Sequence, residues 1–373
     1  ICNSVRKWQE TGNLMQVKCN NINQLNMLMK NKRIICWGIG NYFRAFIDSC
    51  LSNEEAYNLV YLIDNAPDMQ NSYRKVNEKQ IPVISFQEYL KNRCEDDLII
   101  ITTVHYKEII AQVNASDRQI SFIPYALVQH GRNERKCILR REDTMQIPAK
   151  IHYCWFGHGE IPLKDREYIA GWEKLCPKYE IVCWNEDNFD INQNEYVRYA
   201  YSKKKWAFVA DYVRMFVLYH EGGIYQDTDV ELLKNLDELR YQYAYMGMEE
   251  SGCVNSGVGM GTVSGNPVIR EVLQLYDSIT KSDIESWTKW KVNAEWESDV
   301  LRKYGFVANN QYQIVKNIAI YPSNFFSPVL VGQKKVELSN QTFSIHHYHY
   351  SWLDEKQRKA IWDDKIKGNN NDE

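Results

Sequence analysis

The chain has 373 residues, of which 44% are hydrophobic and 25% are charged, and its formal net charge is −3. A charge this close to zero argues against a nucleic-acid-binding protein, and the length and composition predict two domains with hydrophobic cores. No apolar run approaches the roughly 18 residues that a membrane-spanning helix requires.

The ten cysteines are scattered along the chain and form no C-x-x-C pair. Such thiols are typically reduced and buried as small hydrophobic side chains, which predicts a cytoplasmic protein. The chain begins at Ile1 rather than at methionine, so the sequence leaves open a leader or a membrane anchor before it.

The first part of the chain alternates between strand and helix signals. Strands are expected at residues 33–37, 59–63, 82–85 and 98–101, with a helix at about residues 41–51 after the first strand. This alternation is typical of a parallel, Rossmann-like sheet.

A charged, weakly periodic segment at residues 130–146 indicates a linker between two domains. We therefore expect a smaller Rossmann-like domain over residues 1–140 and a second domain over residues 141–373. The tail from about residue 368 is rich in asparagine and is expected to be disordered.

The turn after the first strand carries Gly38 and Gly40, and Asp64 follows the second strand. Glycines and an acidic residue in these places are features of dinucleotide-binding turns, but Phe43 stands where that fingerprint has its third glycine. We favour a nucleotide-free module, used for packing or partner binding, over a nicotinamide site.

The second domain is expected to begin with a strand over residues 150–155 that ends in Trp155. An amphipathic helix over residues 163–176 and a strand over residues 179–184 follow, which again predicts an α/β sheet. From the residues alone, Trp155 is explained equally well as a core aromatic and as a binding residue.

A nearly all-apolar helix is predicted over residues 207–220, and Asp211 and Arg214 lie within it as an i,i+3 pair. Two explanations remain open for these charges. Burying charges without partners is costly, so these side chains need an explanation. Either they form an intrahelical ion pair that closes a core, or they line a polar pocket.

Glycines 222 and 223 end this helix and introduce a short strand that leads to Asp227 and Asp229. Two carboxylates one residue apart can direct hard oxygen ligands toward one Mg²⁺ or Mn²⁺ ion. The sequence therefore predicts a divalent metal site, although an isolated Asp-x-Asp also occurs in solvated turns.

Two later segments carry further candidates. Asn255 lies in a glycine-rich stretch and is either a turn former or a hydrogen-bonding partner of a sugar hydroxyl. His346 or His347 could complete the metal site, but adjacent residues of a strand face opposite sides, so one of them at most would bind. Packing of an aromatic-rich strand and loop at the edge of the sheet explains this segment equally well.

These motifs together resemble family 32 type glycosyltransferases, the DXD-bearing sugar transferases of bacterial polysaccharide and capsule gene clusters. The resemblance covers about residues 145–355, and the clostridial toxin glucosyltransferases are similar at a greater distance. It is carried by residues 147–157, Trp172, residues 176–177, 179–181 and 184–185, Ala207, Asp211, Arg214, residues 222–225, Asp227, Asp229, residues 255–257, His346, His347, Ser351 and Trp352.

The resemblance implies a GT-A-like catalytic domain in which Trp155 stacks on the nucleotide base and Asn255 contacts the sugar. It also implies that Ser351 and Trp352 close over the diphosphate, and that the sugar is transferred with retention of its α configuration. The first domain looks like the small Rossmann-like modules that are sometimes attached to such transferases.

We therefore expect a metal-dependent, retaining hexosyltransferase with Mn²⁺ or Mg²⁺ as cofactor. Asp229 is expected to bind the metal, and Asp227 to share it or to contact the ribose. Asp211 and Arg214 are expected to contact the donor sugar, with Arg214 also near the phosphates.

The expected donor is UDP-galactose or UDP-glucose, and the expected acceptor is a polysaccharide or a lipid-linked oligosaccharide at the inner face of the membrane. The sequence does not identify the oligomeric state. A nicotinamide-dependent sugar-modifying enzyme and a non-catalytic carbohydrate-binding protein remain as alternatives.

Overall fold

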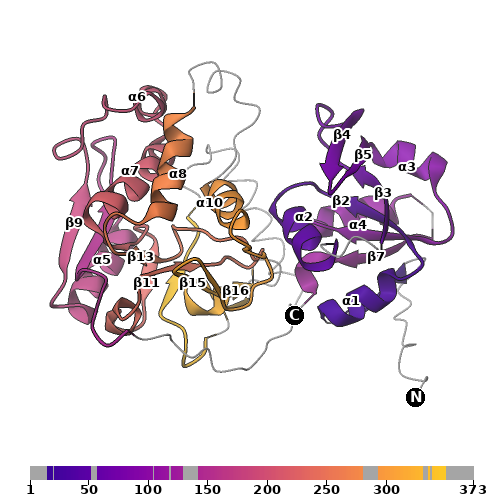
Figure 1. The fold of residues 1–373 in the computed structure, drawn as a ribbon. Coiled ribbons are helices and arrows are strands. Elements are labelled where there is room, and N and C mark those ends of the chain that lie inside the picture. The colour runs from indigo at the N-terminus through magenta and orange to yellow at the C-terminus, as the bar shows by residue number, and fades with distance from the viewer. Residues whose placement is uncertain are drawn as a thin grey trace.

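The structure is a computed structural model, and it describes residues 15–19, 21–51, 57–103, 105–116, 119–128, 142–279, 293–330, 335–336 and 338–349. Within these ranges the chain forms two seven-stranded sheets and two small two-stranded sheets. Figure 1 shows helices packed beside both large sheets, with the N-terminal sheet in indigo and purple. Both large sheets contain parallel strand pairs, which confirms the predicted α/β fold class.

The first sheet has the strand order β1-β7-β6-β2-β3-β5-β4, and only β4 runs antiparallel to its neighbour within the described residues. Its strands are β1 (Met15–Gln16), β2 (Arg33–Trp37), β3 (Asn58–Ile63), β4 (Ser72–Val76), β5 (Lys79–Ile84), β6 (Asp97–Ile101) and β7 (Ser121–Pro124). Its helices are α1 (Ile22–Met29), α2 (Asn41–Phe46), α3 (Phe86–Asn92) and α4 (Tyr106–Asn114), with the short helices η1 (Ile47–Leu51) and η2 (Tyr125–Leu127).

The four strands predicted here are present as β2, β3, β5 and β6. Ile34 and Ile35 of β2 and Ile99 of β6 are fully buried, as expected for central parallel strands with both faces covered. The strand β4 was not predicted, because most of its side chains are polar and exposed and give no apolar alternation.

The second sheet has the order β14-β15-β12-β13-β10-β8-β9 and mixes parallel and antiparallel pairs. Its strands are β8 (Lys150–Cys154), β9 (Glu180–Trp184), β10 (Gly223–Tyr225), β12 (Ala244–Gly247), β13 (Met260–Thr262), β14 (Gln313–Val315) and β15 (Ile318–Tyr321). The small sheets pair β11 (Val230–Leu232) with β18 (Ser344–His346), and β16 (Val329–Leu330) with β17 (Lys335–Val336).

The helices that accompany the second sheet include both of those predicted from the sequence. They are α5 (Leu163–Leu175), α6 (Glu195–Ser202), α7 (Trp206–Glu221), α8 (Pro267–Asp277) and α10 (Asn293–Arg302), with the short helices η3 (Asp237–Arg240) and η4 (Ser323–Phe325). The helix α7 buries Val209, Val213 and Leu218 completely, in agreement with its nearly all-apolar sequence. Most of the predicted linker lies outside the described residues.

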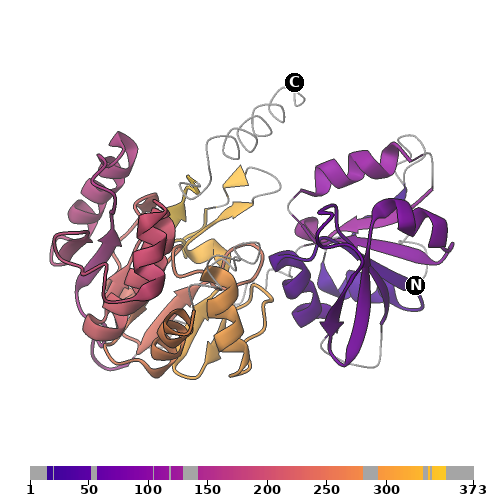
Figure 2. The same cartoon turned by 90° about the horizontal axis from the view of Figure 1, so that it is seen from above.

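The helices α2 and η1, which accompany the first sheet, contact α10 and the residues after it. Figure 1 shows α2 on the side of the first sheet that faces α10, and Figure 2 shows the same two parts of the chain from above. Arg44 of α2 pairs with Asp299 of α10 at 3.0 Å, and Arg302 of α10 pairs with Asp48 at 2.8 Å. Ser49 Oγ donates a hydrogen bond of 3.0 Å to the carbonyl oxygen of Ala308. These polar contacts join the first sheet to the region that carries the candidate site.

No helix in the described ranges is both long enough and apolar enough to cross a membrane. The cysteines that the structure describes are free thiols, and most of them are buried.

Candidate functional site

A cavity of about 620 Å³ lies where β8 and β10 end. These strands are parallel neighbours, so the residues that follow them emerge at the same edge of the sheet. Trp155 follows β8, Asp227 and Asp229 follow β10, and all three line the cavity. Ligands commonly bind at the carboxyl ends of strands in open α/β sheets, and this cavity has that position.

The glycine pair explains how β10 enters the sheet directly after α7. Gly222 and Gly223 have φ angles of 69° and 101°, a region that favours glycine. A Cβ atom on Gly222 would lie 2.7 Å from the backbone nitrogen of Ser264, and one on Gly223 would lie 2.9 Å from His152 Nε2. Side chains at these two positions would therefore displace the start of β10.

His152 fixes the end of α7 against the sheet. Trp184 Nε1 donates to His152 Nδ1 at 3.1 Å, so the imidazole proton is on Nε2, which donates to the carbonyl oxygen of Gly222 at 2.9 Å. Burial lowers the pKa of His152, which keeps the ring neutral. His152 and Trp184 therefore position the chain that leads to Asp227.

Asp227 and Asp229 converge with His346 in one cluster. His346 Nε2 lies 3.6 Å from Asp227 Oδ2 and 3.4 Å from Asp229 Oδ1, and one ligand atom from each residue lies within 4.8 Å of the others. Two carboxylates and an imidazole suit a divalent ion such as Mn²⁺. The donor set therefore fits the expected metal.

The register of β11 and β18 determines which histidine joins the cluster. Val230 pairs with His346, which directs the imidazole of His346 toward the carboxylates. His347 instead lies 2.9 Å from Glu231 Oε2 and stacks on the ring of Tyr168 at 4.8 Å. Of the two histidines considered from the sequence, the structure brings His346 to the Asp-x-Asp and directs His347 elsewhere.

The electrostatics of His346 agree with a cation site. Burial by itself lowers the pKa of this imidazole, but the facing carboxylates of Asp229 and Asp227 outweigh it and raise the pKa above its usual value. The two carboxylates therefore stabilise a positive charge at this position, and either a proton on His346 or a bound metal ion can supply that charge.

Asp229 is held in place by His349, a residue of the histidine-rich segment for which the sequence indicated no role of its own. Its Oδ2 accepts a hydrogen bond of 2.8 Å from the backbone N–H of His349. The His349 ring lies 3.2 Å from Asp165, and Asp165 accepts a further hydrogen bond of 2.7 Å from Thr228. Asp165 and His349 are far apart in the sequence, so no local pattern indicated this support.

Arg214 has both of the roles that the sequence left as alternatives, the intrahelical ion pair and the lining of a polar pocket. Its Nη2 lies 3.3 Å from Asp211 and 2.9 Å from Asp227, and the guanidinium lies 4.8 Å from the centre of the Tyr225 ring. Arg214 is only 4% exposed, yet it and Asp211 line the cavity. The pair is therefore both a buried ion pair and part of the wall of a pocket.

The protonation of Asp211 is sensitive to this arrangement. Burial raises the pKa of Asp211 to about 6, the guanidinium of Arg214 opposes the rise, and Asp227 adds to it. Since two carboxylates share one guanidinium, Asp211 is the one that gains a proton more readily at mildly acidic pH.

A buried acid on α10 supports Arg214 from behind. Arg214 Nη1 donates to Ser256 Oγ at 3.1 Å, and the Ser256 N–H donates to Glu297 Oε2 at 2.7 Å. Glu297 is fully buried, and burial raises its pKa to about 8 despite the nearby charge of Arg214. No local sequence pattern indicated Glu297, because it lies 41 residues after Ser256.

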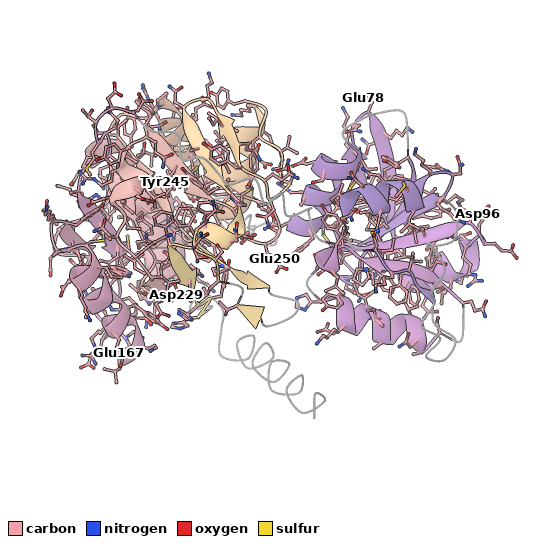
Figure 3. All side chains as sticks on the ribbon, turned by 90° about the horizontal axis from the view of Figure 1, so that it is seen from below. Glu78, Asp96, Glu167, Asp229, Tyr245 and Glu250 are labelled. Carbon is pink, nitrogen blue, oxygen red and sulfur yellow. The ribbon has the colours of Figure 1, made fainter. Side chains whose placement is uncertain are left out.

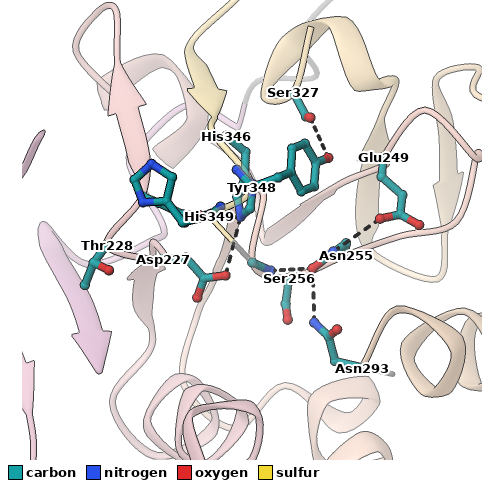
Figure 4. Close-up of polar contacts among 12 residues, drawn as sticks. Asp227, Thr228, Glu249, Asn255, Ser256, Asn293, Ser327, His346, Tyr348 and His349 are labelled. Carbon is teal, nitrogen blue, oxygen red and sulfur yellow. Dashed lines mark hydrogen bonds and ion pairs between the residues drawn. The ribbon is translucent and has the colours of Figure 1, made fainter. Parts of the chain in front are cut away.

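Asn255 lines the cavity, and its amide is also engaged by the protein. Its Oδ1 accepts from the Gly257 N–H at 2.9 Å and from Asn293 Nδ2 at 3.0 Å, while its Nδ2 lies 3.4 Å from Glu249 (Figure 4). The turn role that we considered from the sequence is therefore present, and the position beside the cavity is present as well.

The aromatic wall of the cavity contains more than Trp155. Trp155 is partly exposed, and its Nε1 donates to the carbonyl oxygen of Gly159 at 2.6 Å. Trp206 and Tyr348 line the same cavity and were not predicted from the sequence. Ser351 and Trp352 lie outside the described residues.

The sequence of residues 162–246 matches the model of a protein family described as a glycosyltransferase sugar-binding region containing a DXD motif. This segment includes Asp211, Arg214, Asp227 and Asp229. The match confirms the predicted DXD-bearing glycosyltransferase region.

The curated relatives described next match about a third of the chain. Inositol phosphoceramide mannosyltransferase 3 of Schizosaccharomyces pombe is 31% identical over 140 residues, which are 34% of this chain and 36% of the relative. Subversion of eukaryotic traffic protein A of Legionella pneumophila is 25% identical over 170 residues, which are 37% of this chain and 26% of the relative. The chain therefore spans about a quarter to a third of the length of these relatives.

Among solved structures, one described as PaToxG glycosyltransferase is similar with a TM-score of 0.36 and 18% identity. The similarity covers 42% of this chain and 69% of that one.

Proposed function

We propose that the chain is a divalent-metal-dependent glycosyltransferase that moves a hexose from a nucleotide sugar to a carbohydrate or lipid-linked acceptor. The observation that carries this proposal is the convergence of Asp227, Asp229 and His346 beside a cavity that Arg214 also lines. The family match, which covers Arg214, Asp227 and Asp229, supports it. In this proposal residues 141–373 are a GT-A-like catalytic domain and residues 1–140 a Rossmann-like domain.

Asp229, Asp227 and His346 are the proposed ligands of Mn²⁺ or Mg²⁺. When bound, such an ion supplies Lewis-acid stabilisation of the departing diphosphate. Arg214 is poised to add a fixed positive charge to the same leaving group, since its guanidinium contacts Asp227 and is excluded from solvent. Asp227 therefore contacts this guanidinium while it is also a member of the metal cluster.

The donor subsite is proposed to lie between the metal cluster and the aromatic wall. Trp155 and Trp206 offer surfaces on which a nucleobase could stack, a contact that contributes about 1–3 kcal/mol per base. Asp211 and Asn255 offer hydrogen-bonding groups to the hydroxyls of the sugar. Ser351 and Trp352 keep their proposed role over the diphosphate, and transfer is proposed to retain the α configuration.

The identity of the donor is part of the proposal. The sequence resemblance favours UDP-galactose or UDP-glucose, whereas the names of the fungal relatives refer to mannosyl transfer and so add GDP-mannose to the candidates. A polysaccharide or lipid-linked acceptor would place the enzyme in the cytoplasm, at the inner face of the membrane. A single hydroxyl contact can decide between such donors.

The test is hydrolysis of a panel of UDP-, GDP- and CMP-sugars by the full chain, with Mn²⁺ and with a chelator. The proposal predicts turnover of one donor that requires the metal and is lost in Asp211→Asn. If Mn²⁺ supports neither binding nor hydrolysis of any donor, the transferase function is wrong. Tight NAD(P) binding in that case would favour the nicotinamide-dependent alternative.

A further inference from the structure

The first sheet reverses its strand order between β2 and β6. From β2 the chain adds β3 and β5 on one side, and it then returns to add β6 and β7 on the other side. In open parallel sheets a ligand usually binds outside the carboxyl ends of the two strands at such a reversal. The turn with Gly38 and Gly40 follows β2 at this position.

The sheet's own loops fill the space over Gly38. A Cβ atom on Gly38 would lie 2.9 Å from Thr103 Cβ and 3.1 Å from the carbonyl oxygen of Thr102. Thr102 Oγ1 also donates a hydrogen bond of 2.6 Å to the carbonyl oxygen of Gly38. Gly38 is therefore explained by close packing of two loops rather than by the approach of a phosphate.

The residues after this turn face the cavity of the second sheet. Asn41 and Tyr42, the first residues of α2, line the same cavity as Arg214 and Asp227. The Tyr42 hydroxyl lies 3.4 Å from Glu250, and the Asn41 side chain forms a hydrogen bond to Glu249. Figure 3 shows that Glu250, which belongs to the part of the chain around the second sheet, lies on the side toward the first sheet. The first sheet thus completes a wall of the candidate active site.

This wall has a hydrogen-bonding group without a partner. Asn41 Oδ1 is buried and has no hydrogen-bond partner among the described residues. A buried polar atom is usually satisfied, because leaving it unpaired costs about 1–3 kcal/mol. Since Asn41 lines the cavity, a hydroxyl of a bound molecule could provide the missing donor.

The chemistry of the wall favours an uncharged polyhydroxyl molecule. Glu249 and Glu250 are acidic, and Arg214 is the sole arginine or lysine among the described residues that line the cavity. Arg214 is already engaged by two carboxylates. Burial raises the pKa of Glu249, and either form of its carboxyl can pair with a hydroxyl. An anionic group would find like charges here.

Resting on the proposed transferase function, we propose that Asn41 and Tyr42 form an acceptor subsite together with Glu249 and Glu250. Its ligand is an uncharged saccharide, which binds across the junction of the two sheets. In this arrangement α2, which accompanies the first sheet, selects the acceptor, while the residues that follow the strands of the second sheet hold the donor.

The test compares transfer with hydrolysis in Asn41→Ala, Tyr42→Phe and the control Arg44→Gln. Arg44 lies on the same helix and contacts α10, but it does not line the cavity. The full chain with Mn²⁺ and its donor receives lactose, methyl α-mannoside or, as anionic probe, glucose 6-phosphate. The products of transfer and the free hexose are measured in the same reaction.

We expect a neutral saccharide to accept hexose with at least a tenfold higher kcat/KM than glucose 6-phosphate. The ratio of transfer to hydrolysis should fall at least tenfold in Asn41→Ala, fall less in Tyr42→Phe, and keep the wild-type value in Arg44→Gln. Tyr42→Phe retains the buried ring, so it provides the answer if Asn41→Ala does not fold.

Three results would overturn the proposal. In the first, no neutral saccharide increases nucleotide release above the rate with water. In the second, the anionic probe is the better acceptor. In the third, Arg44→Gln lowers the ratio as much as the cavity variants do, which would indicate a structural role for the junction. Donor hydrolysis by the wild type is measured before any acceptor is added, so failure of the proposed function itself is recognised separately.

Discussion

Replacing Glu297 by glutamine should remove a pH-dependent cost to stability. Glu297 is fully buried on α10, and burial raises the pKa of its carboxyl to about 8. In the structure the N–H and the Oγ hydroxyl of Ser256 both donate to this carboxyl, and when the carboxyl is protonated the hydroxyl can turn to accept from it instead. Glutamine has the same shape and the same pattern of one donor and one acceptor, so Glu297→Gln should preserve the fold.

The sign of the effect follows from the two pKa values. The ordinary pKa of 4.5 applies to the unfolded chain and the value of about 8 to the folded chain. The folded chain therefore binds more protons between these values, and its stability decreases as pH rises from about 4.5 to about 8. At about 1.4 kcal/mol for each pKa unit, this difference corresponds to about 5 kcal/mol.

The assay is urea-induced unfolding of the wild type and of Glu297→Gln at pH 5, 6.5 and 8. Between pH 5 and 8 the wild type should lose several kcal/mol of unfolding free energy relative to the variant. The same substitution at the exposed Glu173 on α5 is the control and should follow the wild type. If the wild type and Glu297→Gln differ by the same amount at every pH, Glu297 is not held neutral by burial.

Three further predictions concern the cavity. Gly257→Ala should weaken Mn²⁺ binding at least tenfold without unfolding the chain, because the added Cβ would collide with Asp227 Oδ2. Isothermal titration calorimetry measures the Mn²⁺ affinity, and an unchanged affinity would contradict the prediction. Arg214→Gln should lower the unfolding free energy by about 3 kcal/mol, because it leaves the partly buried carboxylates of Asp211 and Asp227 without their counter-ion. Urea unfolding measures this, and a loss below about 1 kcal/mol would argue against the pair. Mn²⁺ affinity should rise about tenfold or more from pH 6 to pH 8, because the metal must displace a proton from His346. Burial lowers the pKa of this imidazole, but the carboxylates of Asp229 and Asp227 outweigh burial and raise it. Electron paramagnetic resonance of free Mn²⁺ measures the affinity, and an affinity that does not change with pH would contradict the prediction.

Much of the fold could be predicted because its signals are local. The strands β2, β6, β8 and β9 and the helices α5 and α7 have strong periodic patterns, and each was located within about one or two residues. Polar edge strands such as β4 escaped prediction because their side chains face solvent and show no alternation.

The residues of the candidate site likewise fall into two groups, those that a local pattern indicates and those that only the folded structure brings together. Arg214 and Asp227 were found because they belong to one continuous helix–turn–strand segment. The choice between His346 and His347 depended on the register of β11 with β18, which the sequence does not show. Asn41 could not be found, because it enters the cavity only through the contact of α2 with the second sheet.

Mn²⁺ binding and donor hydrolysis, measured in parallel for the wild type, Asp229→Asn and Glu231→Gln, test the central claim most directly. Both variants remove one carboxylate from neighbouring positions, but Glu231 pairs with His347 and lies outside the metal cluster. We predict that Asp229→Asn loses Mn²⁺ binding and metal-dependent hydrolysis, while Glu231→Gln keeps both. Wild-type Mn²⁺ affinity and turnover in Asp229→Asn would contradict the assignment of this cluster as the catalytic metal site.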